Sequence, residues 1–150
     1  GDARILNNYG SFLFERQRYQ EASAQFQKAA ADNLYAERSR IFENLGITSL
    51  ELGERERGRQ ELEKALRLNP RQPRALLEMA QMSYQDKQYV SARDFYERFS
   101  LLSGQNARSL LLGARLATVF DDRTPTANHG QQLKRLYPGT PEYQQYLSEQ

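Results

Sequence analysis

Apolar and small residues recur along the chain at the three- and four-residue spacings of amphipathic α-helices. This periodicity predicts helices over residues 3–16, 19–31, 35–52, 55–68, 73–86, 89–103, 106–120, 125–136 and 141–149. Residues that end or start helices separate these segments: Gly53 can take the left-handed conformation that closes a helix, and Pro73 and Pro141 suit only a first turn. Asn106 and Thr140 are expected to cap the helices that follow them. The chain is therefore expected to be all-α.

The small residues of this pattern repeat along the chain at spacings of 36 and 34 residues. They fall at Gly10, Gly46 and Ala80 in the first helix of each pair, and at positions 22, 58 and 92 in the second helix. Two helices pack closely only where the side chains at their crossing are small, and large apolar residues at 26, 62 and 96 would fill the space beside the crossing. A helical hairpin that repeats about every 34 residues is the hallmark of tetratricopeptide repeats (TPR).

The sequence thus predicts an all-α TPR superhelical solenoid of about four helical hairpins plus a C-terminal capping helix. We expect a single domain over residues 1–150, with repeats over about 3–36, 39–72, 73–105 and 106–139 and the capping helix over 141–149. The second half of the fourth hairpin follows the pattern loosely, because residues 121–126 are expected to form a widened turn. Terminal repeats are often atypical in this way.

Composition and charge argue against several function classes. The chain has no cysteine, which excludes disulfides, thiol nucleophiles and thiolate metal sites within it. It contains no apolar run of roughly 18 residues that could span a membrane. The formal net charge is +2, and acidic and basic residues alternate, as they do between Glu54 and Lys64. Nucleic-acid binding is not expected, because interleaved signs are typical of a solvated helix face and a phosphate-binding stripe would cluster one sign.

No catalytic residue, metal site or cofactor is predicted. His129 is the only histidine, and with no other histidine or cysteine to complete a metal site we interpret it as an exposed structural residue. Asp121 and Asp122 lack the ligand spacing of a calcium loop. Because no nucleophile–base pair can be assembled from these residues, we do not expect an enzyme.

The first helix of each TPR hairpin lines the inner surface of the solenoid, so the repeat register predicts which side chains face a partner-binding groove. That groove is expected to contain Phe14, Asn44, Ile47, Leu50, Leu77, Gln81, Tyr84 and Leu110. Its apolar members have no evident partner within the chain and could receive the apolar face of a partner helix or an extended segment. The alternative is that they pack on each other within a tightly wound solenoid.

Some TPR domains hold a partner's C-terminal carboxylate in a clamp of Lys, Asn and Arg side chains. Asn44 matches one position of that clamp. Asn7, Ser11 and Glu78 stand where the clamp has lysine, asparagine and a cation. Without two cations a carboxylate loses its charge-assisted hydrogen bonds, so this clamp is not expected.

Four segments are more specific than the TPR pattern: DARILNNYGSFL (2–13), ERSRIFENLG (37–46), QNARSLLLGARL (105–116) and QLKRLYPG (132–139). Together they resemble the type IV pilus biogenesis and stability protein family, PilF (also called PilW). The resemblance implies a TPR-containing outer-membrane lipoprotein of Gram-negative bacteria that faces the periplasm. It implies the role of a pilotin, which promotes outer-membrane localisation and multimerisation of the pilus secretin and so supports twitching motility.

Members of that family have about six repeats behind a lipidated N-terminal cysteine. We therefore expect this chain to be the C-terminal TPR region, soluble by itself, with membrane attachment only through a lipid anchor that it lacks. The predicted partner is the secretin subunit. The alternatives are a rigid TPR spacer, with recognition carried by missing N-terminal repeats, and a generic periplasmic TPR adaptor.

Overall fold

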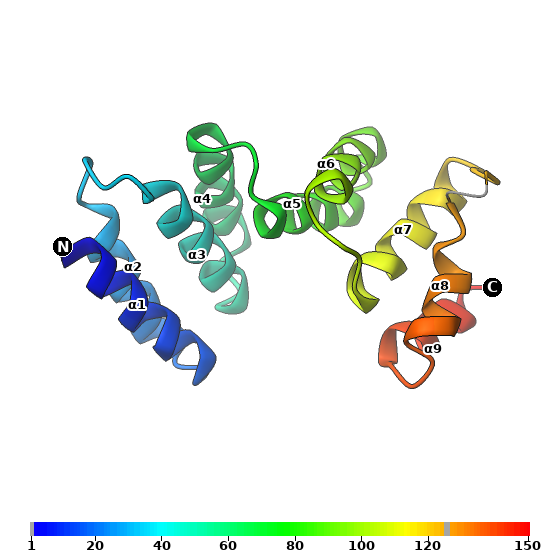
Figure 1. Ribbon diagram of the computed structural model, residues 1–150, viewed down its shortest axis with the longest axis horizontal. Helices are drawn as coiled ribbons and strands as arrows, with labels where there is room; N and C mark the ends of the chain where they lie inside the picture. The colour runs from blue at the N-terminus through cyan, green and yellow to red at the C-terminus, as the bar shows by residue number, and fades with distance from the viewer. Residues whose placement is uncertain (1, 125–126) are drawn as a thin grey trace. The chain divides into compact units, whose positions relative to one another are not determined.

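The computed structural model describes residues 2–124 and 127–150, which form nine α-helices and no strand (Figure 1). The helices are α1 (Asp2–Glu15), α2 (Tyr19–Ala30), α3 (Arg38–Glu51), α4 (Arg55–Leu68), α5 (Pro73–Gln85), α6 (Tyr89–Leu102), α7 (Ala107–Val119), α8 (His129–Leu136) and α9 (Pro141–Ser148). The all-α prediction is confirmed. Residues 125 and 126, where the eighth helix was expected to begin, lie outside the described residues, and α8 begins at His129. Over the described residues, no helix is long and apolar enough to cross a membrane.

The chain divides into two compact units, Gly1–Ala75 and Leu76–Gln150. Unit 1 holds α1 to α4 and the start of α5, and unit 2 holds the rest of α5 together with α6 to α9. Each unit has its own cluster of buried apolar side chains. The single domain over residues 1–150 and its repeat boundaries stay predictions.

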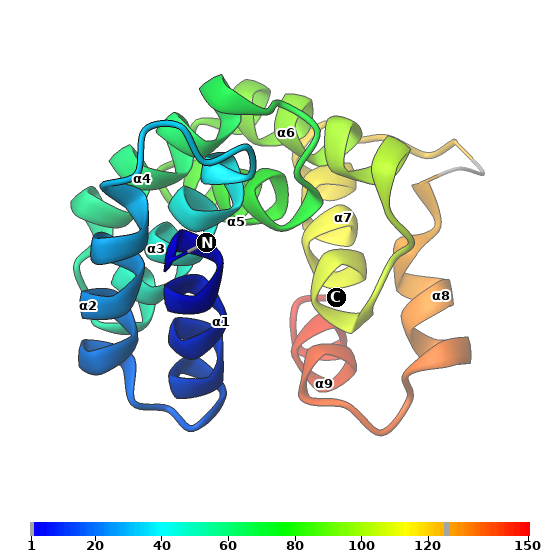
Figure 2. The ribbon, with the colours of Figure 1, turned by 60° about the vertical axis from the view of Figure 1, so that its left-hand side comes forward.

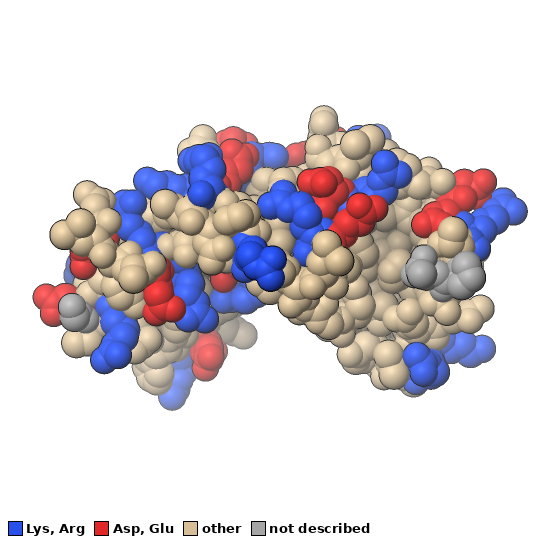
Figure 3. Space-filling model, turned by 45° about the horizontal axis from the view of Figure 1, so that its top comes forward, with Lys and Arg blue, Asp and Glu red and all other residues tan. Residues whose placement is uncertain are grey.

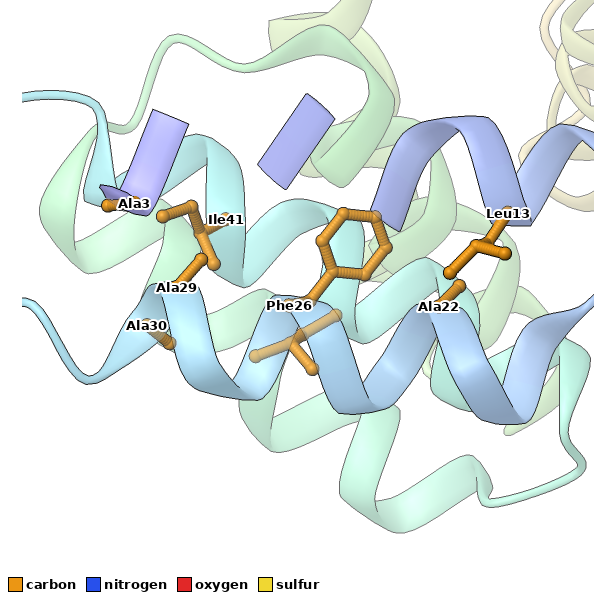
Figure 4. Close-up of a cluster of buried hydrophobic side chains, with 8 residues drawn as sticks. Ala3, Leu13, Ala22, Phe26, Ala29, Ala30 and Ile41 are labelled. Atoms are coloured by element: carbon orange, nitrogen blue, oxygen red, sulfur yellow. The ribbon is translucent and has the colours of Figure 1, made fainter. Parts of the chain in front are cut away.

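The core of unit 1 lies between paired helices, with α1 against α2 (Figure 2) and α3 against α4. At the α1–α2 crossing the small and large residues meet as predicted, since a Cβ atom placed on Gly10 would lie 2.5 Å from the ring of Phe26. Phe26 is buried together with Ala22, Ala29 and Ile41 (Figure 4). The residue sizes at positions 10 and 26 therefore set how closely α1 and α2 approach.

Two glycines lie at the crossing of α3 and α4. A Cβ atom on Gly46 would lie 2.5 Å from Cγ of Leu62 and 3.1 Å from the carbonyl oxygen of Gly58. Leu62 is fully buried, so its movement would disturb the packing of the neighbouring side chains. A larger residue at position 46 therefore requires that the two helices move apart or that Leu62 change its rotamer.

The turn inside each hairpin uses one recurring backbone geometry. Each turn contains an amide that donates to the carbonyl five residues earlier, with N–O distances of 2.8 to 3.0 Å, at positions 18, 54, 88 and 122. The residue before each of these amides has a positive φ: 62° at Gln17, 78° at Gly53, 61° at Lys87 and 49° at Asp121. This is the Schellman type of helix ending. The sequence indicated it only at Gly53, because glutamine and lysine do not favour a left-handed conformation and aspartate adopts it only occasionally.

Helix caps in unit 2 agree with the sequence prediction. The side chain of Asn106 accepts a hydrogen bond from the amide of Ser109, and the Ser109 hydroxyl accepts one from the amide of Asn106, both at 2.8 Å. Thr140 accepts from the amide of Tyr143 at 3.3 Å, with Pro141 in the first turn of α9. Both caps are confirmed, and they fix where α7 and α9 begin.

Candidate protein-binding surfaces

The eight predicted groove residues divide between the two units and differ in exposure. In unit 1 all of them are half-buried, namely Phe14, Asn44, Ile47 and Leu50. In unit 2, Gln81 and Tyr84 are half-buried, but Leu77 is 6% exposed and Leu110 is fully buried. Leu77 and Leu110 offer almost no surface to a partner, so their assignment to an open groove is corrected.

Three apolar members have partners within the chain, which the repeat register did not reveal. The ring of Phe14 packs edge-on against Tyr19, with 5.1 Å between centroids, and the ring of Tyr84 lies 5.6 Å from that of Tyr89. Leu50 lies against Gly58, where a Cβ atom would be 2.9 Å from its Cδ2. All three partners come from the second helix of the same hairpin. The apolar surface left for another protein is therefore smaller than the sequence suggested.

In unit 2 the last helix covers part of α7. Leu110 is buried with Leu111 and Leu133, and the rings of Tyr143 and Tyr146 on α9 pack against this cluster. Arg115 on α7 donates two hydrogen bonds to Glu149, which follows α9, at 3.0 and 2.7 Å. The hollow that remains beside Tyr84 and Arg115 has a volume of about 90 Å³. Burial raises the pKa of Tyr84, and the nearby Arg115 opposes the rise.

The more open surface of unit 1 lies on α1, α3 and the start of α5. We call it the α1–α3 face and define it by Asn7, Ser11, Glu43, Asn44 and Arg74. A hollow of about 680 Å³ lies here, bounded on one side by the segment 69–72 between α4 and α5. A smaller hollow of about 270 Å³ shares Ser11, Asn44 and Arg74 with it and reaches Phe14. The volume of the larger hollow lies within the range of cavities that bind small ligands.

A chain of hydrogen bonds on the α1–α3 face runs from donor to acceptor through Arg74, Asn44 and Asn7. Arg74 Nη1 donates to Oδ1 of Asn44 at 3.2 Å, and Nδ2 of Asn44 donates to Oδ1 of Asn7 at 2.9 Å. Because a guanidinium can only donate, Asn44 must present its oxygen to Arg74 and its nitrogen to Asn7. Of the eight predicted groove residues, Asn44 is the one that lies at the centre of this network.

Glu43 is the buried acid of this face, with 7% of its surface exposed. Its Oε2 accepts a hydrogen bond from the amide of Ala75 in the first turn of α5 at 2.9 Å, and its Oε1 lies 3.7 Å from Nη1 of Arg74. Burial raises the pKa of Glu43, and the amide of Ala75 and the charges of Arg74 and Arg40 oppose the rise. Sequence reasoning did not single out this contact, because it joins residues 32 positions apart.

A clamp for a C-terminal carboxylate is not expected from the sequence, and one residue of unit 2 bears on that expectation. Glu78 stands at the position where the clamp needs a cation. It accepts two hydrogen bonds from Arg108, at 2.6 and 3.0 Å. Its carboxylate is therefore held by α7.

His129 is not the exposed residue that the sequence suggested. It is half-buried and packs edge-on against Tyr96, with 5.8 Å between ring centroids. Burial lowers the pKa of His129, while the backbone of Ala127 and the charge of Asp122 oppose the change. His129 and Tyr96 also border a hollow of about 960 Å³ between α6, α7 and α8. The ring thus contributes to packing between α8 and the preceding helices.

Charges on the surface are mixed in sign. Basic and acidic side chains are intermingled on the face of the molecule drawn in Figure 3. Many form ion pairs within one turn of helix, such as Arg18 with Glu21 and Arg57 with Glu54. Such pairs are typical of solvated helix faces.

Comparison with known proteins agrees with this architecture. A family model for the tetratricopeptide repeat matches residues 44–100. The chain is 53% identical over 148 residues to the type IV pilus assembly protein PilF of Pseudomonas aeruginosa, a match that covers 99% of this chain and 59% of that protein. The chain therefore spans less than two thirds of the length of this relative.

Two solved structures extend the comparison. A structure of Pseudomonas aeruginosa PilF matches with a TM-score of 0.94 and 53% identity, over 99% of this chain and 67% of that chain. A crystal structure of PilW, described as a widely conserved type IV pilus biogenesis factor, matches with a TM-score of 0.74 and 30% identity, over 97% of this chain and 67% of that chain. The TPR solenoid fold is confirmed, and the chain belongs to the PilF/PilW family of type IV pilus biogenesis proteins.

Proposed function

We propose that this chain is the protein-binding part of a pilotin, which promotes outer-membrane localisation and multimerisation of the type IV pilus secretin. The observation that carries the proposal is the 53% identity to PilF across 99% of the chain, together with the TM-score of 0.94. The chain would act by binding polypeptide and without catalysis, as TPR repeats generally do. Its site of action would be the periplasmic face of the outer membrane, with a lipid anchor attached outside these 150 residues.

The α1–α3 face and the neighbouring half-buried Ile47 are the proposed contact surface. Ile47→Asp, placed in the full-length protein, is expected to reduce secretin multimers, because a carboxylate at this position would have to be desolvated when a partner binds. The matched control is Leu34→Asp, because Leu34 is 95% exposed in the loop before α3. The readout is the yield of detergent-resistant secretin multimers in cells that lack their own copy of the protein, with thermal melting of each variant as the folding check.

The second candidate is a rigid spacer whose recognition lies elsewhere in the protein. It is favoured by the burial of Leu77 and Leu110, which removes two apolar residues from the predicted groove. Deleting residues 1–150 from the full-length protein separates the two functions. If the deletion abolishes secretin multimers and a spacer of unrelated repeats does not restore them, recognition by this chain is supported. Unchanged assembly after replacement by that spacer would remove the chain from recognition.

A further inference from the structure

The hollow on the α1–α3 face is bordered by three arginines. Arg40 lies on α3, Arg74 lies in the first turn of α5, and Arg71 lies in the segment before it. The loop that carries Arg71 is held by a hydrogen bond from the Arg71 amide to Oδ1 of Asn69 at 3.0 Å. The guanidinium groups are therefore presented from three separate backbone positions around one depression.

The acids beside this hollow are already engaged. Arg40 pairs with Glu37 at 3.0 Å, and Glu43 is buried against the amide of Ala75. Over the part of the chain that the structure describes, no carboxylate lies within ion-pairing distance of the Arg71 guanidinium. Arg74 keeps a side chain that is 58% exposed, although it reaches Glu43 and Asn44. The three arginines and two acids give the hollow a local charge of about +1.

The hydrogen-bond network makes the same surface rich in donors. Since Arg74 donates to Asn44 and Asn44 donates to Asn7, the oxygen of each amide already accepts one hydrogen bond. The donors on this surface include the Nδ2 group of Asn7 and the outer N–H groups of Arg71 and Arg74, and Gln72 at its border carries a buried acceptor, Oε1, without a hydrogen-bond partner among the described residues. A donor-rich, positively charged depression selects a ligand that is rich in acceptors.

We propose that this hollow binds an extended acidic segment of a partner polypeptide, a specificity that rests on the proposed function of the chain as a binding scaffold. Aspartate or glutamate side chains would pair with Arg71 and Arg74, and a main-chain carbonyl would accept from Nδ2 of Asn7. Isolated monovalent carboxylates fit this site better than a polyphosphate, because Glu37 and Glu43 lie beside the arginines and repel dense negative charge.

The test is titration of the 150-residue chain with a fluorescent, N-acetylated and C-amidated hexapeptide that alternates Glu and Ala. We expect saturable binding that weakens as salt rises from about 50 to about 300 mM, and much weaker binding of the matched peptide that alternates Gln and Ala. Arg71→Ala is expected to weaken the affinity about fivefold, and the double variant with Arg74→Ala about twentyfold. The matched control is Arg135→Ala, which removes an exposed arginine from α8 and should leave the affinity unchanged.

Arg71 is the decisive position, because it is exposed in a loop and its replacement does not disturb the core. Equal affinity of Arg71→Ala and Arg135→Ala would overturn the assignment of the site. Equal binding of the Glu and Gln peptides would overturn the requirement for side-chain carboxylates. If a Gln–Ala peptide with a free C-terminus bound more tightly than the Glu–Ala peptide, the ligand of this hollow would be a terminal carboxylate and not side-chain carboxylates. This titration involves no secretin, so its failure would leave the secretin assay of the proposed function unaffected.

Discussion

Replacing Gly46 by alanine tests whether close contact between helices determines this fold. The added Cβ would lie 2.5 Å from Cγ of Leu62, 2.8 Å from its Cδ2 and 3.1 Å from the carbonyl oxygen of Gly58. Real Cβ atoms do not approach carbon atoms this closely, so α3 and α4 must separate or Leu62 must leave its rotamer. Overpacking of this kind costs about 1–3 kcal/mol of unfolding free energy.

The assay is urea unfolding of the chain followed by circular dichroism, with the midpoint and slope fitted for each variant. Gly104→Ala is the matched control, because a Cβ atom there meets nothing within 4 Å. Gly104→Ala should leave the midpoint close to that of the original chain, whereas Gly46→Ala should lower it.

A double variant identifies the clashing atom. Leu62→Ala alone should cost about 2–5 kcal/mol, because Leu62 is fully buried. In the Gly46→Ala background the same truncation also removes the clash. The double variant should therefore lose less unfolding free energy than the sum of the losses of the two single variants, by about 0.5–3 kcal/mol. Equal midpoints for Gly46→Ala and Gly104→Ala, or strict additivity with Leu62→Ala, would refute this account of the crossing.

Three further predictions follow from single positions. Lys87→Gly should raise the unfolding free energy by about 0.5–1 kcal/mol, because φ is 61° there, and Gly53→Lys should lower it by a similar amount; urea unfolding of the two reciprocal variants checks this. Leu110→Ala should lower the unfolding free energy by about 2–5 kcal/mol, as expected of a buried residue and not of a groove residue, and unchanged melting would contradict this. Burial lowers the folded-state pKa of His129 below its ordinary value of 6.5, so the unfolded chain takes up the proton first and stability falls as pH drops below about 6.5. Urea midpoints at about pH 7.5 and pH 5.5 should therefore fall further apart in the original chain than in His129→Gln.

The parts of the fold that were predictable depend on local chemistry. Helix positions follow from a periodicity of three to four residues, and the caps at Asn106 and Thr140 follow from side chains that reach their own helix. The crossings follow from residue size at Gly10 and Gly46. The left-handed turn at Gln17 was not predictable, because the tertiary packing of two helices imposes a conformation that glutamine does not favour.

The candidate site was less predictable because it depends on contacts between distant residues. The sequence assigned Asn44 to the groove, but it could not show that Arg74 and Asn7 would orient the Asn44 amide. The sequence predicted a capping helix over 141–149, but it could not show that Tyr143 and Tyr146 would pack against the cluster that holds Leu110, so Leu110 was still assigned to the groove. A groove assigned from repeat positions alone therefore overestimates exposed apolar surface wherever a terminal helix folds back.

Glu43 connects the stability of unit 1 with the proposed specificity of the α1–α3 face. Its carboxylate satisfies the amide of Ala75 but is buried enough that its pKa is raised, so the negative charge itself adds little to stability. Glu43→Gln keeps an acceptor for that amide and should unfold at nearly the same urea concentration as the original chain. Glu43→Leu leaves the amide without a partner and should cost about 1–3 kcal/mol.

The same pair of variants separates stability from binding. Glu43→Gln removes a negative charge beside Arg74, so the local charge of the hollow rises and the affinity for the Glu–Ala peptide should increase by up to about fivefold. If Glu43→Gln changed neither the stability nor the peptide affinity, the charge of Glu43 would have no effect on the bound ligand. Selection of acidic segments would then have to depend on Arg71, the arginine of this hollow that has no acid beside it among the residues that the structure describes.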